Sequence, residues 1–443
     1  VNPDGRDYFL DGTGSGARTG HIPVDSDGDG LTDEDGPNDL NGNGVIEQIR
    51  KYVPGQGSFR LDPTDSRFMQ PVGPGETGDW ELLGSEGIDD DGDGRTNEDP
   101  VGGYDPNRNY GADWQPNYIQ GGAMDYPFRL PEARAINDFM VERPNIAGFQ
   151  SFHNSGGMIL RPPGSAWYGD YPASDIRVYD ELGETGERML PYYNYYVIWR
   201  GLYTVHGGSI DWTNDGLGIV SFSNELWNSG QYFNSPLLQE QQRDQNSPIS
   251  GQSSRFFFDD LLEHGDEYIE WAPFDHPEYG QVEMGGWKKL SGRVNPRFMS
   301  MELFHRNMAF TLYHADMMPM MSMGETSVER VGGDLYKVRV DITNERLIPT
   351  VTAEARDNRV VAPDIINVSG GVEVVAAGWV ASKVRPGPTQ MIDQNDLNRI
   401  MIRSGAPGRV TRTIEYLVRG SGSMTVEYVS QKGGTVSTSL QVR

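Results

Sequence analysis

Residues suited to binding and proton transfer follow one another in a set order through the first half of the 443-residue chain. His153 and Glu225 each end a mainly apolar run, and Tyr203 precedes the Gly207–Gly208 pair, where the missing side chains let another group approach the backbone. Arg108 carries a planar guanidinium that can hold a carboxylate through two parallel hydrogen bonds. Each residue is a weak signal alone, so the information lies in their order and spacing.

Helices and strands with clear sequence patterns are predicted to position these residues. Pro131 can start a helix over 131–143, in which apolar residues recur at helical spacing, namely Ala133, Ile136, Phe139 and Met140. The apolar segment 146–153 then predicts a buried strand. A helix followed by a strand is the crossover unit of a parallel sheet, and ligands bind at the carboxyl ends of such strands. His153 is therefore expected where a metal ligand belongs.

Two further helices and an all-β region are predicted downstream. One helix is expected over about 186–206, leading to Tyr203. Another is expected over 299–318, with an apolar face formed by Leu303, Phe304, Met308, Leu312 and Tyr313. From about residue 326 onward, runs of alternating apolar and polar residues are separated by glycine and proline. This pattern predicts an antiparallel β-sandwich for packing or attachment, because it contains no catalytic constellation.

Three acidic loops carry oxygen-bearing side chains at alternate positions and a glycine at the sixth position, as a calcium-binding loop requires. The predicted ligands are Asp25, Asp27, Asp29 and Asp33 in the first loop, Asp39, Asn41, Asn43 and Glu47 in the second, and Asp89, Asp91, Asp93 and Asn97 in the third. None has the acidic twelfth residue of an EF-hand, although Glu34–Asp35 and Glu98–Asp99 could substitute. Because close carboxylates repel, we expect two or three structural calcium ions. The second loop is the weakest of the three candidates for calcium binding. A solvated acidic linker is the alternative.

Composition limits the classes of function. The net charge of −27 argues against nucleic acid as a partner, because phosphate would be repelled. The absence of cysteine excludes disulfides and thiol chemistry. No apolar run approaches the roughly 20 residues of a membrane-spanning helix, and the calcium loops are of an extracellular type. We therefore expect a secreted, periplasmic or cell-surface protein of bacterial origin, with two or three domains.

Taken together, the motifs resemble those of the carboxypeptidase A-type zinc metallocarboxypeptidases. Six features match in the family's order, namely Asn2-Pro3-Asp4-Gly5, Asn107-Arg108-Asn109-Tyr110, His153, Tyr203, Gly207-Gly208-Ser209-Ile210-Asp211-Trp212 and Glu225. The resemblance implies an α/β fold with a mixed, mostly parallel sheet flanked by helices. The expected domains are residues 1–325, the later portion of a catalytic domain with insertions at about 25–99 and 228–297, and residues 326–443, an accessory β-sandwich.

The resemblance also assigns roles to individual residues. His153 is implied to bind a catalytic zinc ion, and Glu225 to act as general base and general acid. Asn107-Arg108 and Tyr203 are implied to hold the terminal carboxylate of a substrate, and Ile210 to form the floor of the pocket for the last side chain. The implied reaction is hydrolysis of the C-terminal peptide bond of peptides or proteins, with apolar or aromatic last residues preferred because the pocket floor is aliphatic.

Some residues of the family pattern are not found where the pattern requires them. A His-x-x-Glu pair that supplies two zinc ligands should precede Asn2, and we expect it on an upstream fragment of the same protein. His264-Gly265-Asp266-Glu267 matches the pair in type but follows Glu225, so the match is interpreted as coincidental. Arg18 stands near the position of an arginine that polarises the scissile carbonyl, and a solvated surface arginine fits it equally well. Two alternatives stay open: a catalytically silent, calcium-stabilised binding or surface protein, and a cell-wall peptide hydrolase of the same family.

Overall fold

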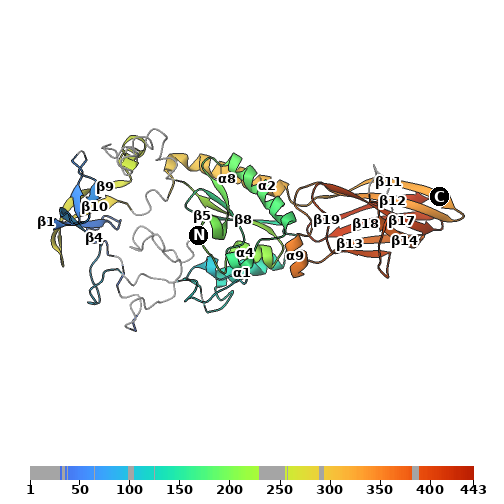
Figure 1. Cartoon of the computed structure of the whole chain (residues 1–443), viewed down its shortest axis with the longest axis horizontal. Helices are drawn as coiled ribbons and strands as arrows, with labels where there is room; N and C mark the ends of the chain where they lie inside the picture. The colour runs from blue at the N-terminus through green and yellow to red at the C-terminus, as the bar shows by residue number, and fades with distance from the viewer. Residues whose placement is uncertain are drawn as a thin grey trace.

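The computed structural model describes residues 30–31, 35–36, 38–63, 65–97, 104–123, 125–228, 255–256, 258–288, 294–381 and 389–443. The molecule is elongated, with a six-stranded sheet at one end, an α/β unit in the middle and a C-terminal β region at the other end (Figure 1). Five residues of the predicted site lie outside the described residues: Arg18, Asp25, Asp27, Asp29 and Asp33. The Asn2–Gly5 motif lies outside them as well.

The middle unit is built on a four-stranded sheet in the order β5-β8-β6-β7. Its strands are β5 (Gly148–Asn154), β6 (Met158–Arg161), β7 (Asn194–Val197) and β8 (Val220–Leu226). Strand β5 pairs with β8 in parallel, and so does β6 with β7, whereas β6 and β8 are antiparallel. The predicted mixed, mostly parallel sheet is therefore confirmed.

Helices cover both faces of this sheet, with α2 and α8 on one side and α1 and α4 on the other (Figure 1). The helices are α1 (Pro131–Val141), α2 (Ala173–Met189), α3 (Ile198–Gly201), α4 (Ser209–Asp215) and α8 (Ser300–Asp316), and the helical turns are η1 (Pro106–Arg108), η2 (Ala166–Tyr168) and η4 (Arg297–Met299). Phe222 of β8 is fully buried, and its ring meets those of Tyr179 and Phe310 edge-on, 5.3 and 5.6 Å between centroids. Among the described residues, no helix has the length and apolar character needed to cross a membrane.

Two helix predictions are corrected by the structure. The single helix expected over 186–206 is not formed, because α2 ends at Met189, β7 follows, and only the short α3 is helical beyond it. Pro191 cannot continue a helix, and the Tyr-Tyr-Val sequence of β7 favours a strand. In α1, Ala133 and Met140 are buried as expected, whereas the other two members of the predicted stripe, Ile136 and Phe139, are exposed.

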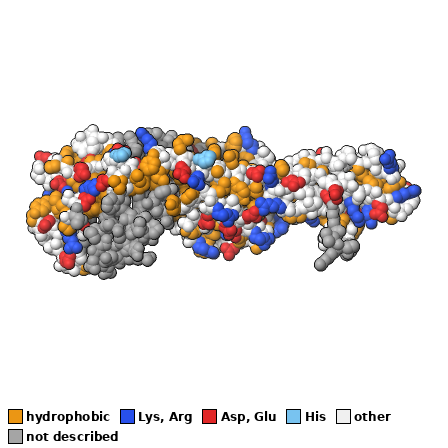
Figure 2. All heavy atoms as spheres, turned by 90° about the horizontal axis from the view of Figure 1, so that it is seen from above, with side chains coloured by type: hydrophobic (Ala, Val, Ile, Leu, Met, Phe, Trp, Pro, Cys, Tyr) orange, Lys and Arg blue, Asp and Glu red, His pale blue; other side chains and the backbone are white. Residues whose placement is uncertain are grey.

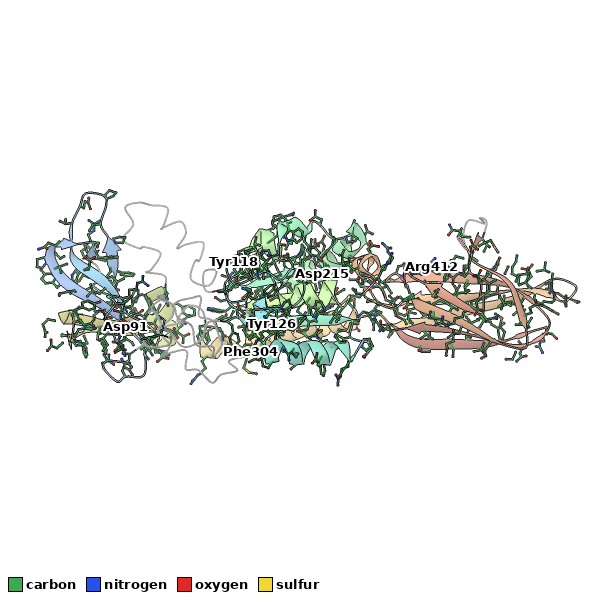
Figure 3. All side chains as sticks on the ribbon, turned by 90° about the horizontal axis from the view of Figure 1, so that it is seen from below. Asp91, Tyr118, Tyr126, Asp215, Phe304 and Arg412 are labelled. Atoms are coloured by element: carbon green, nitrogen blue, oxygen red, sulfur yellow. The ribbon has the colours of Figure 1, made fainter. Side chains whose placement is uncertain are left out.

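Helix α8 confirms the predicted helix but presents a different face to the core. Its buried residues are Asn307, Phe310 and His314. Phe304, Met308 and Leu312 are exposed, and Phe304 (Figure 3) lies on the surface of the middle unit, where Figure 2 shows apolar side chains among the charges. The buried amide of Asn307 accepts a hydrogen bond of 3.0 Å from Asn224. A pattern based on hydrophobicity assigned the wrong face because hydrogen bonds allow polar side chains to be buried.

The outer sheet combines strands from both predicted insertions in the order β3-β2-β4-β1-β10-β9. The strands are β1 (Gln48–Gly57), β2 (Phe59–Leu61), β3 (Met69–Pro71), β4 (Gly78–Ser85), β9 (Tyr268–His276) and β10 (Gly280–Trp287). All pairs are antiparallel, and β1 pairs with β10 with Ile49 opposite Met284. The 228–297 insertion, expected to be irregular, thus contains a β-hairpin. Its partner strand lies more than 200 residues away, so local sequence could not indicate the pairing.

The C-terminal region consists of two antiparallel sheets in the orders β11-β12-β17-β14-β15 and β16-β13-β18-β19. Its elements are β11 (Met321–Gly332), β12 (Leu335–Asn344), α9 (Ala353–Asn358), β13 (Asp364–Gly370), β14 (Glu373–Trp379), β15 (Gln390–Met391), β16 (Arg399–Ile402), β17 (Val410–Arg419), β18 (Gly422–Ser430) and β19 (Gly434–Val442). Alternate residues of both sheets, such as Val340, Tyr416 and Val426, are fully buried in one shared core. The predicted all-β region is therefore confirmed.

Polar contacts join this region to the middle unit. The Asp175 carboxylate accepts hydrogen bonds from the first backbone amides of α9, those of Ala353 and Glu354, at 3.0 and 2.8 Å. The Lys432 ammonium donates to the carbonyl of Ile146, immediately before β5, at 2.6 Å. Burial lowers the pKa of Lys432 to about 8. The junction is thus a packed interface with several hydrogen bonds.

Candidate functional site

His153 and Glu225 lie side by side at the carboxyl ends of two parallel strands. They are direct partners in the register of β5 and β8. The His153 Nε2 atom lies 2.8 Å from the Ser151 hydroxyl. Burial lowers the pKa of His153, the negative charge of Asp105 opposes this shift, and the positive charge of Arg108 adds to it. The imidazole is therefore held in its neutral form near neutral pH, which is the form that binds metal ions.

The predicted carboxylate clamp is assembled from two loops. Arg108, at the end of η1, donates from its guanidinium to the Tyr203 hydroxyl at 3.3 Å and to the Asn107 carbonyl at 2.9 Å. The Asn107 side-chain oxygen accepts the backbone N–H of Ser209 at 2.9 Å. Asp105 forms a 3.6 Å ion pair with Arg108. These contacts bring together Asn107, Arg108 and Tyr203, which are separated by almost a hundred residues in sequence.

The glycine turn fits against this clamp because it lacks side chains. Gly207 has a φ of +67°, and a Cβ atom there would lie 2.5 Å from the Arg108 carbonyl oxygen. The Gly207 carbonyl also accepts the backbone N–H of Tyr110 at 2.9 Å. Glycine is needed at this position both for the left-handed backbone and for the close approach. Ser209 then begins α4, and Ile210 follows within its first turn.

Ile210 is buried in an aliphatic cluster with Leu160, Ile198 and Val205. These residues come from β6, α3 and the turn before the glycine pair. Partly buried apolar side chains pack against this cluster. The surroundings of Ile210 are therefore apolar, as the predicted pocket floor requires.

Asp113 organises the same region and was missed by the sequence analysis. Its carboxylate accepts hydrogen bonds from the Ser165 hydroxyl at 2.7 Å and the Trp167 indole at 2.9 Å, and its Oδ2 lies 2.8 Å from Nδ1 of His206. Asp113 has a φ of +47°, a conformation that aspartate adopts more readily than most residues. The partners lie 52 to 93 residues away in sequence, so no local motif indicated this node.

Two further carboxyl groups, those of Asp211 and Asp215, are buried on helix α4. The Asp211 carboxylate accepts the backbone N–H of Gly164 at 2.7 Å, and Asp215 accepts the Tyr171 hydroxyl at 2.8 Å. Burial, with the nearby charge of Asp215 adding to it, raises the pKa of Asp211 to about 8. Burial also raises the pKa of Asp215 to about 6. Near neutral pH the fold therefore favours the protonated form of Asp211, and it makes Asp215 easier to protonate than an ordinary aspartate.

The two described acidic loops share one backbone pattern. In the second loop, the Asp39 carboxylate accepts the N–H of Gly44 at 2.8 Å, and in the third loop Asp89 accepts the N–H of Gly94 at 2.9 Å. The second loop is closed internally, because the side-chain amides of Asn41 and Asn43 both donate to Glu47, which leaves Glu47 bonded to the loop itself.

A group of three carboxylates involves the third loop. Asp35, Asp89 and Asp91 place ligand oxygens within 4.8 Å of one another, the one such group among the described residues. Asp91 lies in the region of the outer sheet (Figure 3). Asp93 pairs instead with Arg95 at 3.6 Å, and the Asn97 amide donates to the Glu86 carbonyl at 3.1 Å. The structure thus brings Asp35 to the third loop and directs two predicted ligands elsewhere.

The zinc ion implied by the resemblance was tested against these side chains. The neutral imidazole of His153, at the strand end beside Glu225, suits a zinc ligand. Across the described ranges, His153 does not belong to any group of three potential ligands. The described residues therefore fit one ligand position of a zinc site and leave the others to be supplied.

Comparisons with known proteins agree with this geometry over part of the chain. Residues 83–246 match the family model described as zinc carboxypeptidase, and residues 320–441 match a domain of unknown function (DUF8731). Human carboxypeptidase A1 is 29% identical over 145 residues, and carboxypeptidase A1 of Sus scrofa is 31% identical over 146 residues. Each alignment covers 29% of this chain and 33% of the relative, so the chain spans about a third of the length of these relatives.

Among solved structures, the crystal structure of carboxypeptidase A from Helicoverpa armigera is 24% identical, with a TM-score of 0.25, and the match covers 28% of this chain and 32% of that one. Residues 83–246 thus carry a zinc carboxypeptidase domain match, and the resemblance drawn from the motifs is confirmed for this part of the chain.

Proposed function

We propose that residues 1–325 form the later portion of the catalytic domain of a zinc-dependent carboxypeptidase, and that residues 326–443 are an accessory domain. The enzyme would hydrolyse the C-terminal peptide bond of peptides or proteins. One observation carries this proposal. His153 and Glu225 are paired at the ends of two parallel strands, near a loop in which Arg108 is hydrogen-bonded to Tyr203.

Each residue has a role that its surroundings support. Asn107 and Arg108 bind the terminal carboxylate of the substrate, and the exposed Tyr203 ring closes over it, since its hydroxyl already reaches the guanidinium. Glu225 accepts a proton from the attacking water and delivers it to the leaving amine. Fixing the substrate in register lowers the entropic cost of reaching the transition state.

His153 would hold the zinc ion together with a His-x-x-Glu pair from another segment of the same protein. A bound zinc ion supplies Lewis acidity, which polarises the scissile carbonyl and lowers the pKa of water. The neutral state of His153 is available for this role without loss of a proton at neutral pH.

The acidic loops support a second part of the proposal, structural calcium. Asp35, Asp89 and Asp91 are gathered from two loops, and an oxygen-only set of this kind suits calcium. Calcium in these loops fits a secreted or cell-surface protein, because calcium is plentiful outside cells. The first and second loops would add further ions.

The test is an assay of the purified full-length protein, with zinc added, on peptides that end in phenylalanine. We expect stepwise release of the last residue, detected by mass spectrometry. Glu225→Gln should lower kcat by roughly 10²- to 10⁴-fold without changing the melting temperature. Cleavage at internal bonds, or full activity of the Glu225→Gln variant, would overturn the proposal. Faster cleavage of cell-wall peptides than of ordinary peptides would favour that member of the family instead.

A further inference from the structure

A small acidic cavity lies between the outer sheet and the end of β8. Its volume is about 20 Å³, which is room for one water-sized or ion-sized particle. The side chains that matter in its lining are Trp227, Arg255, Asp259, Glu263, Glu267 and Trp287. None of these residues belongs to the predicted calcium loops or to the carboxylate clamp.

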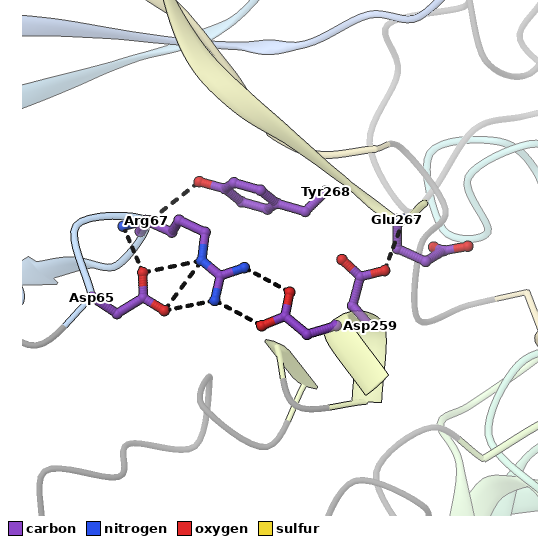
Figure 4. Close-up of polar contacts among 6 residues, drawn as sticks. Asp65, Arg67, Asp259, Glu267 and Tyr268 are labelled. Atoms are coloured by element: carbon purple, nitrogen blue, oxygen red, sulfur yellow. Dashed lines mark hydrogen bonds and ion pairs between the residues drawn. The ribbon is translucent and has the colours of Figure 1, made fainter. Parts of the chain in front are cut away.

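A tight chain reversal brings the three acidic residues together. Asp259 and Glu263 are the two ends of a single π-helical turn, η3 (Asp259–Glu263). His264 and Gly265 then adopt positive φ values of +62° and +78°, and the chain returns so that the backbone N–H of Glu267 donates to the Asp259 carboxylate at 2.9 Å. Figure 4 shows Asp259 and Glu267 adjacent after this reversal. His264 is exposed and is not among the residues that line the cavity.

Among the described residues, few positively charged side chains lie near these carboxyl groups, and one of them, Arg67, is paired with other carboxylates. Asp259 is 2% exposed, and its Oδ2 atom has no hydrogen-bond partner within the described structure, which is also true of Oε1 of Glu263. Arg67 is held at 2.8 Å by both Asp65 and Asp260 (Figure 4). Arg255 is the one cationic side chain that lines the cavity among the described residues, and its guanidinium stacks over the Trp287 ring at 3.7 Å.

The energetic consequence is an uncompensated negative charge in a buried place. Burial raises the pKa of all three carboxyl groups, and neighbouring carboxylates raise those of Glu263 and Glu267 further. Among the described lining residues, three carboxyl groups face one guanidinium, so their full ionisation would leave two negative charges to be neutralised. A buried carboxylate that lacks a partner is costly, and a divalent cation removes that cost directly.

We propose that this cavity is a calcium site in which Asp259, Glu263 and Glu267 supply the oxygen ligands. Hard divalent cations select carboxylate oxygens, and calcium tolerates the irregular geometry of such a set better than magnesium does. The three carboxylates are more widely spaced than the Asp35–Asp89–Asp91 group. Binding of an ion would draw the glutamate side chains inward by rotation, and water would supply the remaining oxygens.

The position of the cavity gives the ion a structural role beyond the insertion itself. Trp227 is buried, has a φ of +63° and follows Glu225 by two residues. Its backbone carbonyl accepts the N–H of Gly156 at 2.8 Å. An ion bound to Asp259 would therefore hold the chain reversal beside Trp227, the residue that follows β8. This inference concerns ion binding and does not depend on the proposed peptidase activity.

The test is to count bound calcium ions by native mass spectrometry and by calorimetric titration of the full chain. We expect Asp259→Asn to bind one calcium ion fewer than the unsubstituted protein. The matched control is Asp266→Asn in the same reversal, because the Asp266 side chain is 80% exposed and pairs only with Lys288 among the described contacts. This control should retain every ion. An unchanged count in Asp259→Asn would overturn the proposal.

Two additional variants separate this site from the loops and from misfolding. Glu263→Gln, at a less buried carboxyl group, should weaken the same ion at least tenfold even if Asp259→Asn fails to fold. Asp91→Asn should remove a different ion, and the double variant Asp91→Asn/Glu263→Gln should affect both. If the loss caused by Asp91→Asn already includes the ion affected by Glu263→Gln, the cavity is not a separate site and the proposal fails.

Discussion

The middle α/β unit and the outer sheet both bury carboxylates, but they neutralise them differently. In the middle unit, Asp211 and Asp215 lie side by side and burial raises their pKa values to about 8 and about 6. In the outer region, Glu86 is fully buried and accepts three backbone amides, those of Leu40, Asn41 and Glu47.

This difference predicts how the stability of each region responds to pH and to cations. Burial raises carboxyl pKa values in both regions, that of Glu86 included, so both should lose stability as the pH rises. The middle unit should do so most strongly, because the pKa of Asp211 reaches about 8. The outer region gathers Asp35, Asp89 and Asp91 within 4.8 Å and places acidic loops around the sheet, so it should be sensitive to cations. The predictions that follow test this division.

The largest effect is expected from Asp211→Asn. The pKa of Asp211 is about 8 in the fold against a reference value of 3.8, so the folded protein retains a proton that the unfolded chain loses above pH 4. The stability of the unsubstituted protein should therefore fall as pH rises from about 4 to about 8 and level off above that, by a few kcal/mol in total. Asparagine keeps the acceptor for Gly164 and removes the titration. Denaturant unfolding across this pH range should show a flatter profile for the variant.

The control for this prediction is Asp215→Asn. Asp215 has a pKa of about 6, so its substitution should flatten the profile below about pH 6. Because it also removes the charge that helps to raise the pKa of Asp211, the remaining decline should move to lower pH without disappearing. If Asp211→Asn keeps the full slope between pH 6 and 8, the proton is not held by Asp211.

Removal of calcium should have the next largest effect, and it should be concentrated in the outer region and in the residues that directly follow β8. A ligand present at 100 times its Kd stabilises the folded state by about 2.7 kcal/mol, and EGTA would remove this contribution. Hydrogen exchange should accelerate in β1, β4 and β10, whereas β5 and β8 should remain protected. Excess magnesium with EGTA is the control for chelation itself. Equal acceleration in both sheets would mean that the two regions do not differ as described.

The sequence predicted the middle unit better than the outer one, and the reason is physical. The helix-strand pattern placed His153 at the end of a strand, and the family resemblance assigned Tyr203, Gly207–Gly208 and Glu225 to the same site. The structure pairs His153 with Glu225 at the ends of β5 and β8. The outer sheet depends on β1 pairing with β10. That contact joins two insertions that are separated in the sequence by most of the middle unit, and no local periodicity predicts it.

Within the middle unit, the failures are at polar residues that are buried. Asn307 and His314 occupy the buried face of α8, so a pattern of apolar residues predicted the opposite face. Asp113 was not recognised because its three partners come from distant segments. Hydrogen-bond satisfaction of buried polar groups is a property of the assembled fold, and sequence spacing does not reveal it.

Ile210→Asp would place a buried carboxylate, like those of the outer region, in the apolar part of the middle unit. Ile210 is 3% exposed among aliphatic side chains, so the proposed pocket offers no partner to a charged last residue. We expect the unsubstituted enzyme to release phenylalanine or leucine faster than lysine or arginine. The variant should shift the ratio of kcat/KM toward lysine and arginine by about 10- to 100-fold. The measurement is competitive hydrolysis of peptides that differ in their last residue, at high salt to suppress attraction by the acidic surface. Faster release of lysine by the unsubstituted enzyme would contradict the assigned pocket.

Asp113→Asn should give the smallest effect, because it alters a carboxylate whose hydrogen bonds are fully matched. The Asp113 carboxylate contacts Ser165, Trp167 and His206, and His206 directly precedes the glycine turn that lies against Arg108. Asparagine has one acceptor oxygen in place of two, so at least one of the three contacts is lost and the turn gains freedom. Since this turn positions the clamp and does not contact the scissile bond, KM should rise about three- to tenfold while kcat changes little. Asp125→Asn is the matched control, because the Asp125 side chain is 74% exposed on the same loop. A fall in kcat with unchanged KM would place Asp113 closer to the chemistry than the hydrogen bonds indicate.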